Sequence, residues 1–202
     1  MTGKPDSVYT FIDNSNLFIE MKRIAKIAYA YDAEQIFRLR TEFGKLLEVV
    51  REGRDIGGTV LVGSRPPQAD TLWAKLKNMG IQPKIFDRSS VTGREKGVDA
   101  EVVNAIRDVM EDNAVPGIIA LIAGDGDYLS TLERCLKKRW KVEIYFWSNA
   151  SSSLKRLPGA RFFELDQYLP QISFVAPERP RGTGEGRVGE EVTAYGGAGE
   201  TN

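Results

Sequence analysis

Short apolar runs alternate along this chain with longer segments in which apolar residues recur every three or four positions. The short runs predict buried strands, and the periodic segments predict amphipathic helices. The predicted strands cover residues 8–12, 59–62, 82–86, 118–123, 141–147 and 161–164. The predicted helices cover residues 17–31, 32–52, 72–79, a segment from 98 onward, a segment after 127 and a short piece at 154–157. This alternation favours an α/β fold, a three-layer α/β/α sandwich whose mainly parallel sheet has about five or six strands.

The stretch GIIALIAGDGDY at residues 117–128 carries the strongest functional signal. Its apolar run is typical of a strand buried on both faces. Asp125 and Asp127 follow the carboxyl end of that strand, where open α/β sheets bind ligands. Two neighbouring carboxylates repel each other, and a divalent cation with oxygen ligands would offset this repulsion. Helix capping by Asp125 and a favourable helix dipole at Asp127 explain the same residues equally well, so both interpretations stay open.

Further charged residues are expected at the same edge of the sheet. Asp13 ends the first predicted strand, and right-handed crossovers place the loops that hold Asp13, Arg65 and Asp87 beside the GDGD turn. Asp99 lies in the first turn of the helix that starts near residue 98, at helical spacing from its apolar stripe. We therefore expect Asp99 on the buried side of that helix, where a carboxylate is costly unless it is paired or binds metal. Its position also suits the helix dipole.

The composition narrows the chemistry that is available. Lysine plus arginine and aspartate plus glutamate each total 28, so any site for a polyanion must be local. Histidine is absent, which excludes histidine bases and histidine-ligated zinc. The single cysteine, Cys135, is expected in the core of a helix rather than as a nucleophile. Carboxylates are therefore the side chains that remain for acid–base chemistry and metal binding.

The ends of the sequence differ from its centre. The first residues lack a basic segment followed by an apolar one, and no run approaches the roughly 18 apolar residues of a membrane helix. We therefore expect a soluble cytoplasmic protein that does not enter a membrane. Residues 1–170 are predicted to form one domain. From about residue 176 the sequence is glycine-rich and polar, so residues 176–202 are predicted to be a disordered tail.

Several motifs together resemble a known family. The segments FIDNSN, EKGVDAEVV, LIAGDGDYLSTLERCLKKRWKVEIYF and RFFEL are similar, in order and spacing, to the NYN family of the PIN-like nuclease superfamily. The resemblance spans roughly residues 8–169. The positions that match the acidic and polar residues of the family motifs are Asp13, Asn16, Asp99, Asp125 and Asp127.

The resemblance implies a PIN-like fold and a metal-dependent endoribonuclease. Asp13, Asp99, Asp125 and Asp127 would then hold Mg²⁺ or Mn²⁺, directly or through waters, and Asn16 would orient a ligand or a water. Hydrolysis of a phosphodiester needs neutralised phosphoryl oxygens and an activated water, which such a cation supplies. The expected partner is RNA, bound by one chain, a homo-oligomer or a larger RNA-processing complex. Its phosphates would meet the basic candidates Lys96, Arg94, Arg65, Arg88 and Lys22.

Other functions compete with this interpretation. Family members often carry a further aspartate at the position of Ala105, so an RNA-binding module with a weakened metal site is an alternative. A phosphatase of the haloacid dehalogenase type would need an aspartate where this chain has Ser15. A metal-dependent adhesion module would use Asp13, Ser15 and Asn16 but would leave Asp99 and the GDGD turn unexplained.

Overall fold

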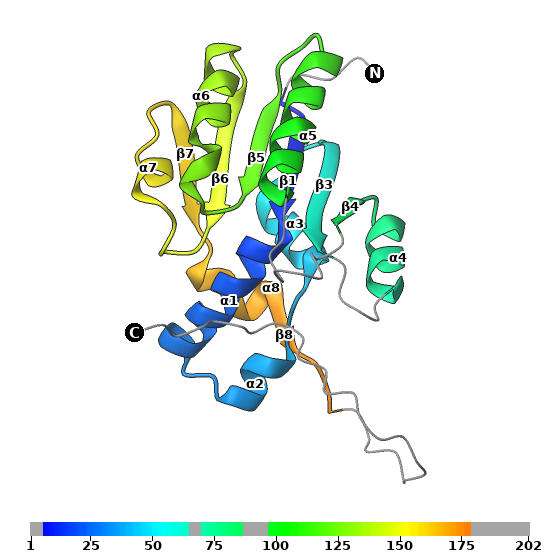
Figure 1. The fold of residues 1–202 in the computed structure, drawn as a ribbon, viewed down its shortest axis with the longest axis vertical. Helices are drawn as coiled ribbons and strands as arrows, with labels where there is room; N and C mark the ends of the chain where they lie inside the picture. Colours follow the sequence, from blue (N-terminus) through cyan, green and yellow to red (C-terminus); the bar gives the residue numbers. More distant parts are fainter. Residues whose placement is uncertain (1–5, 65–69, 87–96, 179–202) are drawn as a thin grey trace.

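A six-stranded parallel sheet forms the centre of the molecule, in a computed structural model that describes residues 6–64, 70–86 and 97–178. The strand order is β4-β3-β1-β5-β6-β7, and each neighbouring pair is parallel (Figure 1). The strands are β1 (Val8–Asp13), β3 (Ile56–Ser64), β4 (Gln82–Phe86), β5 (Ile118–Ile122), β6 (Lys141–Phe146) and β7 (Ala160–Glu164). The predicted α/β class and parallel sheet are confirmed.

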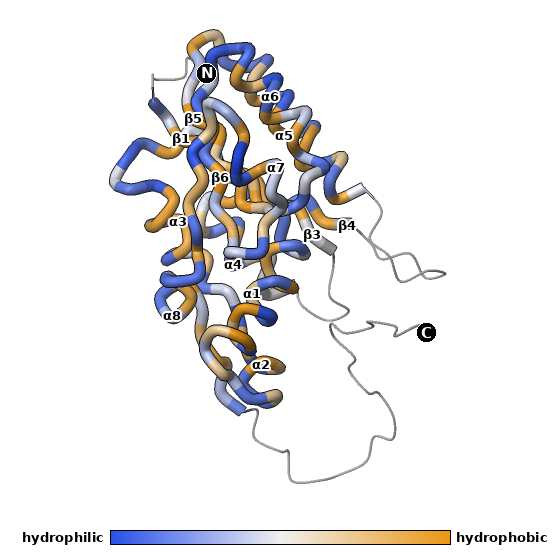
Figure 2. Tube along the Cα trace, turned by 90° about the vertical axis from the view of Figure 1, so that its left-hand side faces the viewer, coloured by the Kyte–Doolittle hydropathy of each residue, from blue (hydrophilic) through white to orange (hydrophobic). Residues whose placement is uncertain are grey.

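Helices cover both faces of this sheet. One face packs against α1 (Asn14–Tyr29), α3 (Phe43–Arg51), α4 (Asp70–Asn78) and α8 (Leu169–Ile172). The other packs against α5 (Val98–Asp112), α6 (Leu129–Lys137) and α7 (Ser152–Lys155). In α5 and α6, hydrophobic and hydrophilic residues alternate along the helix, as expected for helices with one face on a core (Figure 2). None of the helices in the described ranges is long and apolar enough to cross a membrane.

Strand β5 shows why the apolar runs specify strands. Ile118, Ala120 and Ile122 belong to the hydrophobic cluster on one face of the sheet. Ile119 and Leu121 belong to the cluster on the other face. Since side chains in a strand alternate between faces, an uninterrupted apolar run supplies both cores at once. The short motif therefore places β5 in the sheet interior, as predicted.

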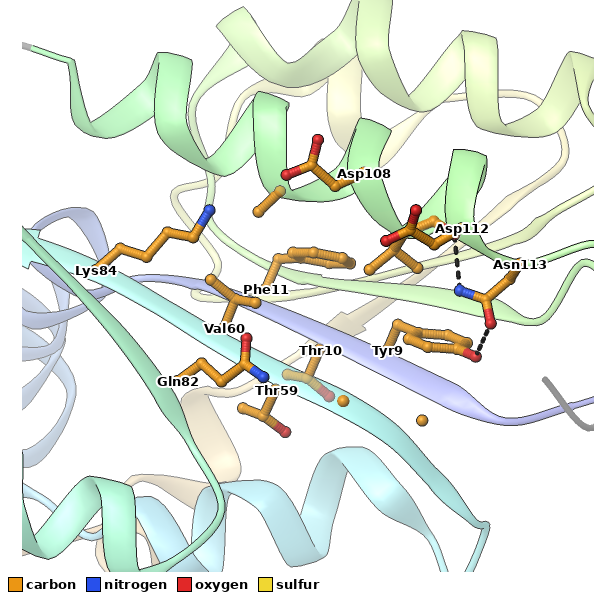
Figure 3. A pocket seen from close by; sticks show the side chains of 14 residues that line it. Tyr9, Thr10, Phe11, Thr59, Val60, Gln82, Lys84, Asp108, Asp112 and Asn113 are labelled. Carbon is orange, nitrogen blue, oxygen red and sulfur yellow. Dashed lines mark hydrogen bonds between the residues drawn. The ribbon is translucent and has the colours of Figure 1, made fainter. Parts of the chain in front are cut away.

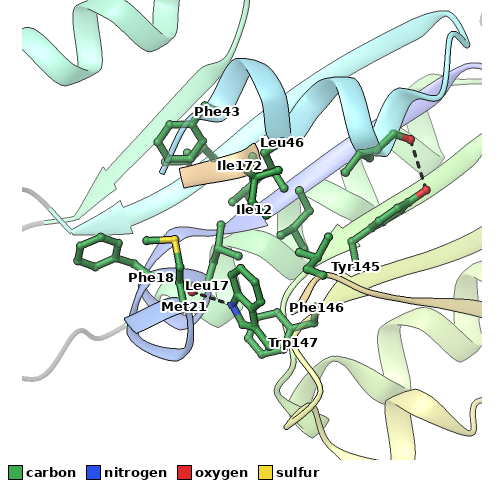
Figure 4. Packing of buried hydrophobic residues seen from close by; sticks show 14 of the residues in the cluster. Ile12, Leu17, Phe18, Met21, Phe43, Leu46, Tyr145, Phe146, Trp147 and Ile172 are labelled. Carbon is green, nitrogen blue, oxygen red and sulfur yellow. Dashed lines mark hydrogen bonds between the residues drawn. The ribbon is translucent and has the colours of Figure 1, made fainter. Parts of the chain in front are cut away.

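One of the two cores joins the end of β6 to the start of α1. Trp147, just after β6, is fully buried, and its indole N–H donates to the carbonyl of Leu17 at 3.0 Å. Figure 4 shows this bond beside Ile12, Met21 and Phe146. Replacing such a buried aromatic residue with alanine typically costs about 3–5 kcal/mol. This packing holds α1 firmly against the carboxyl ends of the strands.

The predicted single helix over residues 32–52 is wrong. The structure has α2 (Ala33–Arg38), a short strand β2 (Leu39–Thr41) and then α3. Strand β2 pairs in antiparallel fashion with β8 (Ser173–Val175), a strand that the sequence did not predict. Leu39 is fully buried in this pairing, and its hydrophobic spacing in the sequence fits a helix as well. Pairing with β8, which lies far away in the sequence, makes residues 39–41 a strand rather than part of a helix.

The remaining elements agree with the predictions apart from their ends. The piece at 154–157 is α7, and the turn after β7 contains the 3₁₀ helix η2 (Asp166–Tyr168), which continues into α8. Ala176 is tied to the domain, because its N–H donates to the carbonyl of Arg38 at 2.9 Å. Most of the predicted tail, residues 179–202, lies outside the described residues, so its disorder stays a prediction.

Candidate active site

Asp13 ends β1 and begins α1, and its two carboxylate oxygens have different partners. Oδ1 accepts a hydrogen bond from the backbone N–H of Asn16 at 3.0 Å, which makes Asp13 the N-cap of α1. Oδ2 lies 2.9 Å from the hydroxyl of Tyr128. The residue is only 3% exposed. A polar residue directly after an apolar strand thus becomes a buried carboxylate at the edge of the sheet.

The GDGD turn lies beside Asp13, because β5 is the neighbour of β1 in the sheet. The two strand ends are joined by Asn16, whose side-chain oxygen accepts a hydrogen bond from Gly124 N–H at 2.8 Å. Gly124 leaves no room for a side chain, since a Cβ there would stand 2.1 Å from the ring of Phe146. The predicted convergence of Asp13 and the turn is confirmed. Asn16 serves as a clamp, which gives it a structural role besides the predicted one.

The hydroxyl of Tyr128 lies at hydrogen-bonding distance from two carboxylates. It is 2.9 Å from Asp13 Oδ2 and 3.0 Å from Asp99 Oδ1. Tyr128 belongs to the 3₁₀ helix η1 (Gly126–Tyr128), which follows β5, and Asp99 lies in the first turn of α5. Three elements that are separate in the sequence therefore meet at one oxygen atom.

Burial raises the pKa of Tyr128 above its usual value, and the negative charges of Asp13 and Asp99 raise it further. The side chain is fully buried, so the phenol stays neutral and has one proton to donate. Tyr128 is not among the site residues that the motifs predict. Its only signal was its place directly after GDGD, and a tyrosine there also fits a core position.

The predicted burial of Asp99 is wrong. The apolar stripe of α5 predicted it on the buried side, yet the residue is exposed. Val98 and Val102 make the contact with the core, and Asp99 lies at the margin of that contact. Its carboxylate still reaches Tyr128, so the site keeps one side open to solvent.

Asp125 and Asp127 are both exposed, and they interact with each other. The Asp125 carboxylate accepts a hydrogen bond from the Asp127 backbone N–H at 3.2 Å and caps η1. The structure therefore agrees with the interpretation of Asp125 as a helix cap. Within the described ranges, no three aspartate, glutamate, histidine or cysteine side chains form a group that could hold a metal ion. The structure thus brings Asp13 and Asp99 together, and a centre with all four aspartates stays a prediction.

The donor set of this pair nevertheless fits a hard cation. Mg²⁺ in phosphate-handling sites is usually held by one or two carboxylates, several waters and the substrate phosphates. Asp13 and Asp99 provide two carboxylates around one point, with only oxygen donors, and Asp99 opens the site to solvent. A site of this composition is suited to a cation that arrives with its waters or with a phosphate.

Comparison with known proteins identifies the family. The family model of the NYN domain matches residues 7–166, which is most of the chain. The chain belongs to the NYN family. This family lies within the PIN-like nuclease superfamily, so the resemblance of the motifs is confirmed.

The NYN domain also shares its fold with a solved structure. The crystal structure of a protein of unknown function from Vibrio parahaemolyticus superposes with a TM-score of 0.59 at 17% sequence identity. The match covers 81% of this chain and 94% of that chain. At this identity the likeness concerns the fold alone. No curated protein matches the chain significantly.

Lys22 is the predicted RNA contact that the structure describes. It lies on α1 of the NYN domain, and its ammonium is 4.6 Å from the centre of the Phe18 ring. Burial lowers the pKa of Lys22, and the neighbouring charge of Arg40 lowers it further. Arg40 is not among the basic residues that the sequence predicts as RNA contacts. The other predicted contacts, together with Asp87, lie outside the described residues: Arg65, Arg88, Arg94 and Lys96.

A separate groove of about 490 Å³ lies between α5 and strands β1, β3 and β4 (Figure 3). Ala105 lines it, along with Asp108 and Asp112 from the same helix and Lys84 from β4. The Lys84 ammonium forms an ion pair of 2.5 Å with Glu101. The groove therefore has carboxylates along one wall and a neutralised lysine opposite. This charge disfavours an RNA phosphate, so the groove is not part of the candidate site.

Proposed function

We propose that this NYN domain is a metal-dependent endoribonuclease that hydrolyses phosphodiester bonds in RNA. The observation that carries the proposal is the meeting of Asp13 and Asp99 at the Tyr128 hydroxyl. Two carboxylates held this close repel each other, and an added divalent cation relieves that repulsion. Membership of a family within a nuclease superfamily supports the same conclusion.

Asp13 and Asp99 would hold Mg²⁺ or Mn²⁺, and Asp125 and Asp127 would join through waters or by side-chain rotation. Both residues of the turn are exposed, so their side chains can turn without disturbing the core. A bound cation supplies charge neutralisation at the phosphoryl oxygens and a water of lowered pKa. The protein's own part would be to hold Asp13 at the end of β1 and Asp99 at the start of α5, so that a cation and a phosphate are positioned between them.

Basic side chains would hold the RNA backbone beside this site. Lys22 lies on α1, the helix that Asp13 caps, so the helix begins at the acidic pair and extends toward the lysine. The sequence adds Arg94 and Lys96 just before Asp99, and Arg65 and Arg88 after two further strands. Contacts to a few phosphates position an RNA chain without reading its sequence.

The decisive experiment is a cleavage assay with end-labelled structured and single-stranded RNA in Mn²⁺, in Mg²⁺ and in chelator. We expect cleavage that requires the cation and is lost in Asp13→Asn. Asparagine is as good an N-cap as aspartate, so this variant keeps the start of α1 and loses the charge. Asp108→Asn is the matched control, because it removes an exposed carboxylate of α5 on the groove side. It should cleave as the parent does.

The outcomes separate the proposal from its alternatives. Cleavage that Asp13→Asn retains would place the chemistry elsewhere. RNA binding by the parent protein without cleavage, in either cation and on both kinds of RNA, would instead make the domain a binding module derived from a nuclease.

A further inference from the structure

Tyr128 is held in place by its surroundings rather than by its hydroxyl. Its ring is fully buried in the hydrophobic cluster that also contains Val102 and Leu132. The close packing of such a cluster leaves a ring little freedom to move. The hydroxyl oxygen is therefore a fixed point between β1, η1 and α5.

An apolar role alone does not explain this residue. A phenylalanine would fill the same ring volume, whereas a buried hydroxyl is costly unless it is hydrogen-bonded. Here the groups within reach are two carboxylates, Asp13 Oδ2 at 2.9 Å and Asp99 Oδ1 at 3.0 Å. A hydroxyl carries a single proton, so it donates to one of the two at a time. The hydroxyl oxygen is thus the common point that both carboxylates approach, and its proton can orient either of them.

We infer that the Tyr128 hydroxyl positions Asp13 and Asp99 for a divalent cation, an inference that rests on the proposed function. Carboxylates that bind metals are oriented by hydrogen bonds from neighbouring groups. Loss of such a neighbouring group typically lowers metal affinity about tenfold to a hundredfold. Asp99 is exposed, and its Oδ1 lies 3.0 Å from the Tyr128 hydroxyl, so this contact orients a carboxylate that the core does not enclose. Tyr128 is thus a positioning residue, which acts through the two aspartates.

The test is a direct titration of the full chain with Mn²⁺, in which electron paramagnetic resonance measures the free ion. The parent is compared with Tyr128→Phe and with the matched control Tyr145→Phe. Tyr145 is also buried, and its hydroxyl lies 2.9 Å from a buried carboxylate, that of Glu143, outside the candidate site. We expect the Kd for Mn²⁺ to rise about tenfold to a hundredfold in Tyr128→Phe and to stay unchanged in Tyr145→Phe. Near-ultraviolet circular dichroism checks that each variant is folded.

Two results would overturn the inference. Folded Tyr128→Phe that binds Mn²⁺ as tightly as the parent would show that the hydroxyl is only structural. Tighter binding would show that the hydroxyl competes with the cation. Either result leaves the proposed function standing, whereas a parent that binds no Mn²⁺ removes the proposed function and this inference with it. Tyr128→Met, which replaces the ring with a flexible apolar chain, is titrated if the phenylalanine variant does not fold.

Discussion

Asp13 and Glu143 are equally buried at 3% exposure, and each has a tyrosine hydroxyl 2.9 Å from its carboxylate. Their other neighbours differ. Glu143, near the amino end of β6, receives two parallel hydrogen bonds from the guanidinium of Arg54, at 3.0 and 2.9 Å. At Asp13, on the carboxyl edge of the sheet, the same hydroxyl that approaches it also approaches the second carboxylate, Asp99.

Under the proposed function, Glu143 is a structural carboxylate and Asp13 is one that binds a cation. At Glu143 the chain supplies the opposite charge itself, and the pair raises the pKa of Arg54, with the hydrogen bond to Glu143 as the largest cause. Bidentate pairs of this kind are well suited to burial. At Asp13 the fold brings the carboxylate of Asp99 to the same hydroxyl, and under the proposed function a cation would offset the repulsion between the two carboxylates. Burial and a tyrosine partner alone do not distinguish the two carboxylates, whereas the second group that each meets in the described part of the chain does: a guanidinium at Glu143 and, across the shared hydroxyl, a carboxylate at Asp13.

The largest expected effect is on catalysis. Asp99→Asn should reduce Mn²⁺-dependent cleavage by about a thousandfold, equivalent to about 4 kcal/mol of transition-state stabilisation. Glu143→Gln, measured per folded molecule, should cleave at the parent's rate. Single-turnover cleavage of labelled RNA measures both variants. Equal rates for Asp99→Asn and the parent would abolish the distinction between the two carboxylates.

The next effect is on stability, and we expect it at Glu143. Glu143→Ala leaves Arg54 without its main partner and should lower the free energy of unfolding by about 3 kcal/mol. This is the lower end of the usual range, because the Arg54 side chain is 22% exposed and can regain water. Urea denaturation measures the change. Glu48→Ala, which removes an exposed ion pair with Lys45, is the control and should cost less than about 1 kcal/mol.

Cation binding should stabilise the fold through the carboxylate of Asp13 and not through that of Glu143. At a hundredfold excess over its Kd, Mn²⁺ should raise the free energy of unfolding of the parent by about 2.7 kcal/mol. Thermal unfolding with and without chelator measures this gain. We expect it to vanish in Asp13→Asn and to persist in Glu143→Gln. A gain that Asp13→Asn retains would place the cation elsewhere on the chain.

The smallest effect concerns Tyr145 at alkaline pH. Burial raises the pKa of Tyr145, and the charge of Glu143 raises it further. The unfolded chain loses this proton near pH 10 while the folded chain keeps it, so the stability present below about pH 10 falls as the pH rises. One such group contributes a slope of up to about 1.4 kcal/mol per pH unit. Urea denaturation of the parent and of Tyr145→Phe over this range should show a shallower decline in the variant.

The sequence by itself determined the layered architecture and the edge of the sheet at which the candidate site lies. Runs such as residues 118–123 are apolar at every position, and this local property requires a strand with a core on each face. A parallel sheet with right-handed crossovers then has its loops at one edge. Asp13 and the GDGD turn could be placed together by these rules alone, without knowledge of any contact.

Tertiary structure decided what local spacing left open. Leu39 has a spacing that fits a helix, but pairing of its strand with residues 173–175 far along the chain made it part of β2. The exposure of Asp99 followed from the way α5 leans on the sheet, which no window of sequence encodes. Tyr128 and Glu143 show the reason most clearly. Tyr128 meets Asp99 and Asp13, which lie 29 and 115 residues away in the sequence, and Glu143 meets Arg54, which lies 89 residues away. Only the packing of whole elements decides which side chains stand beside a buried carboxylate.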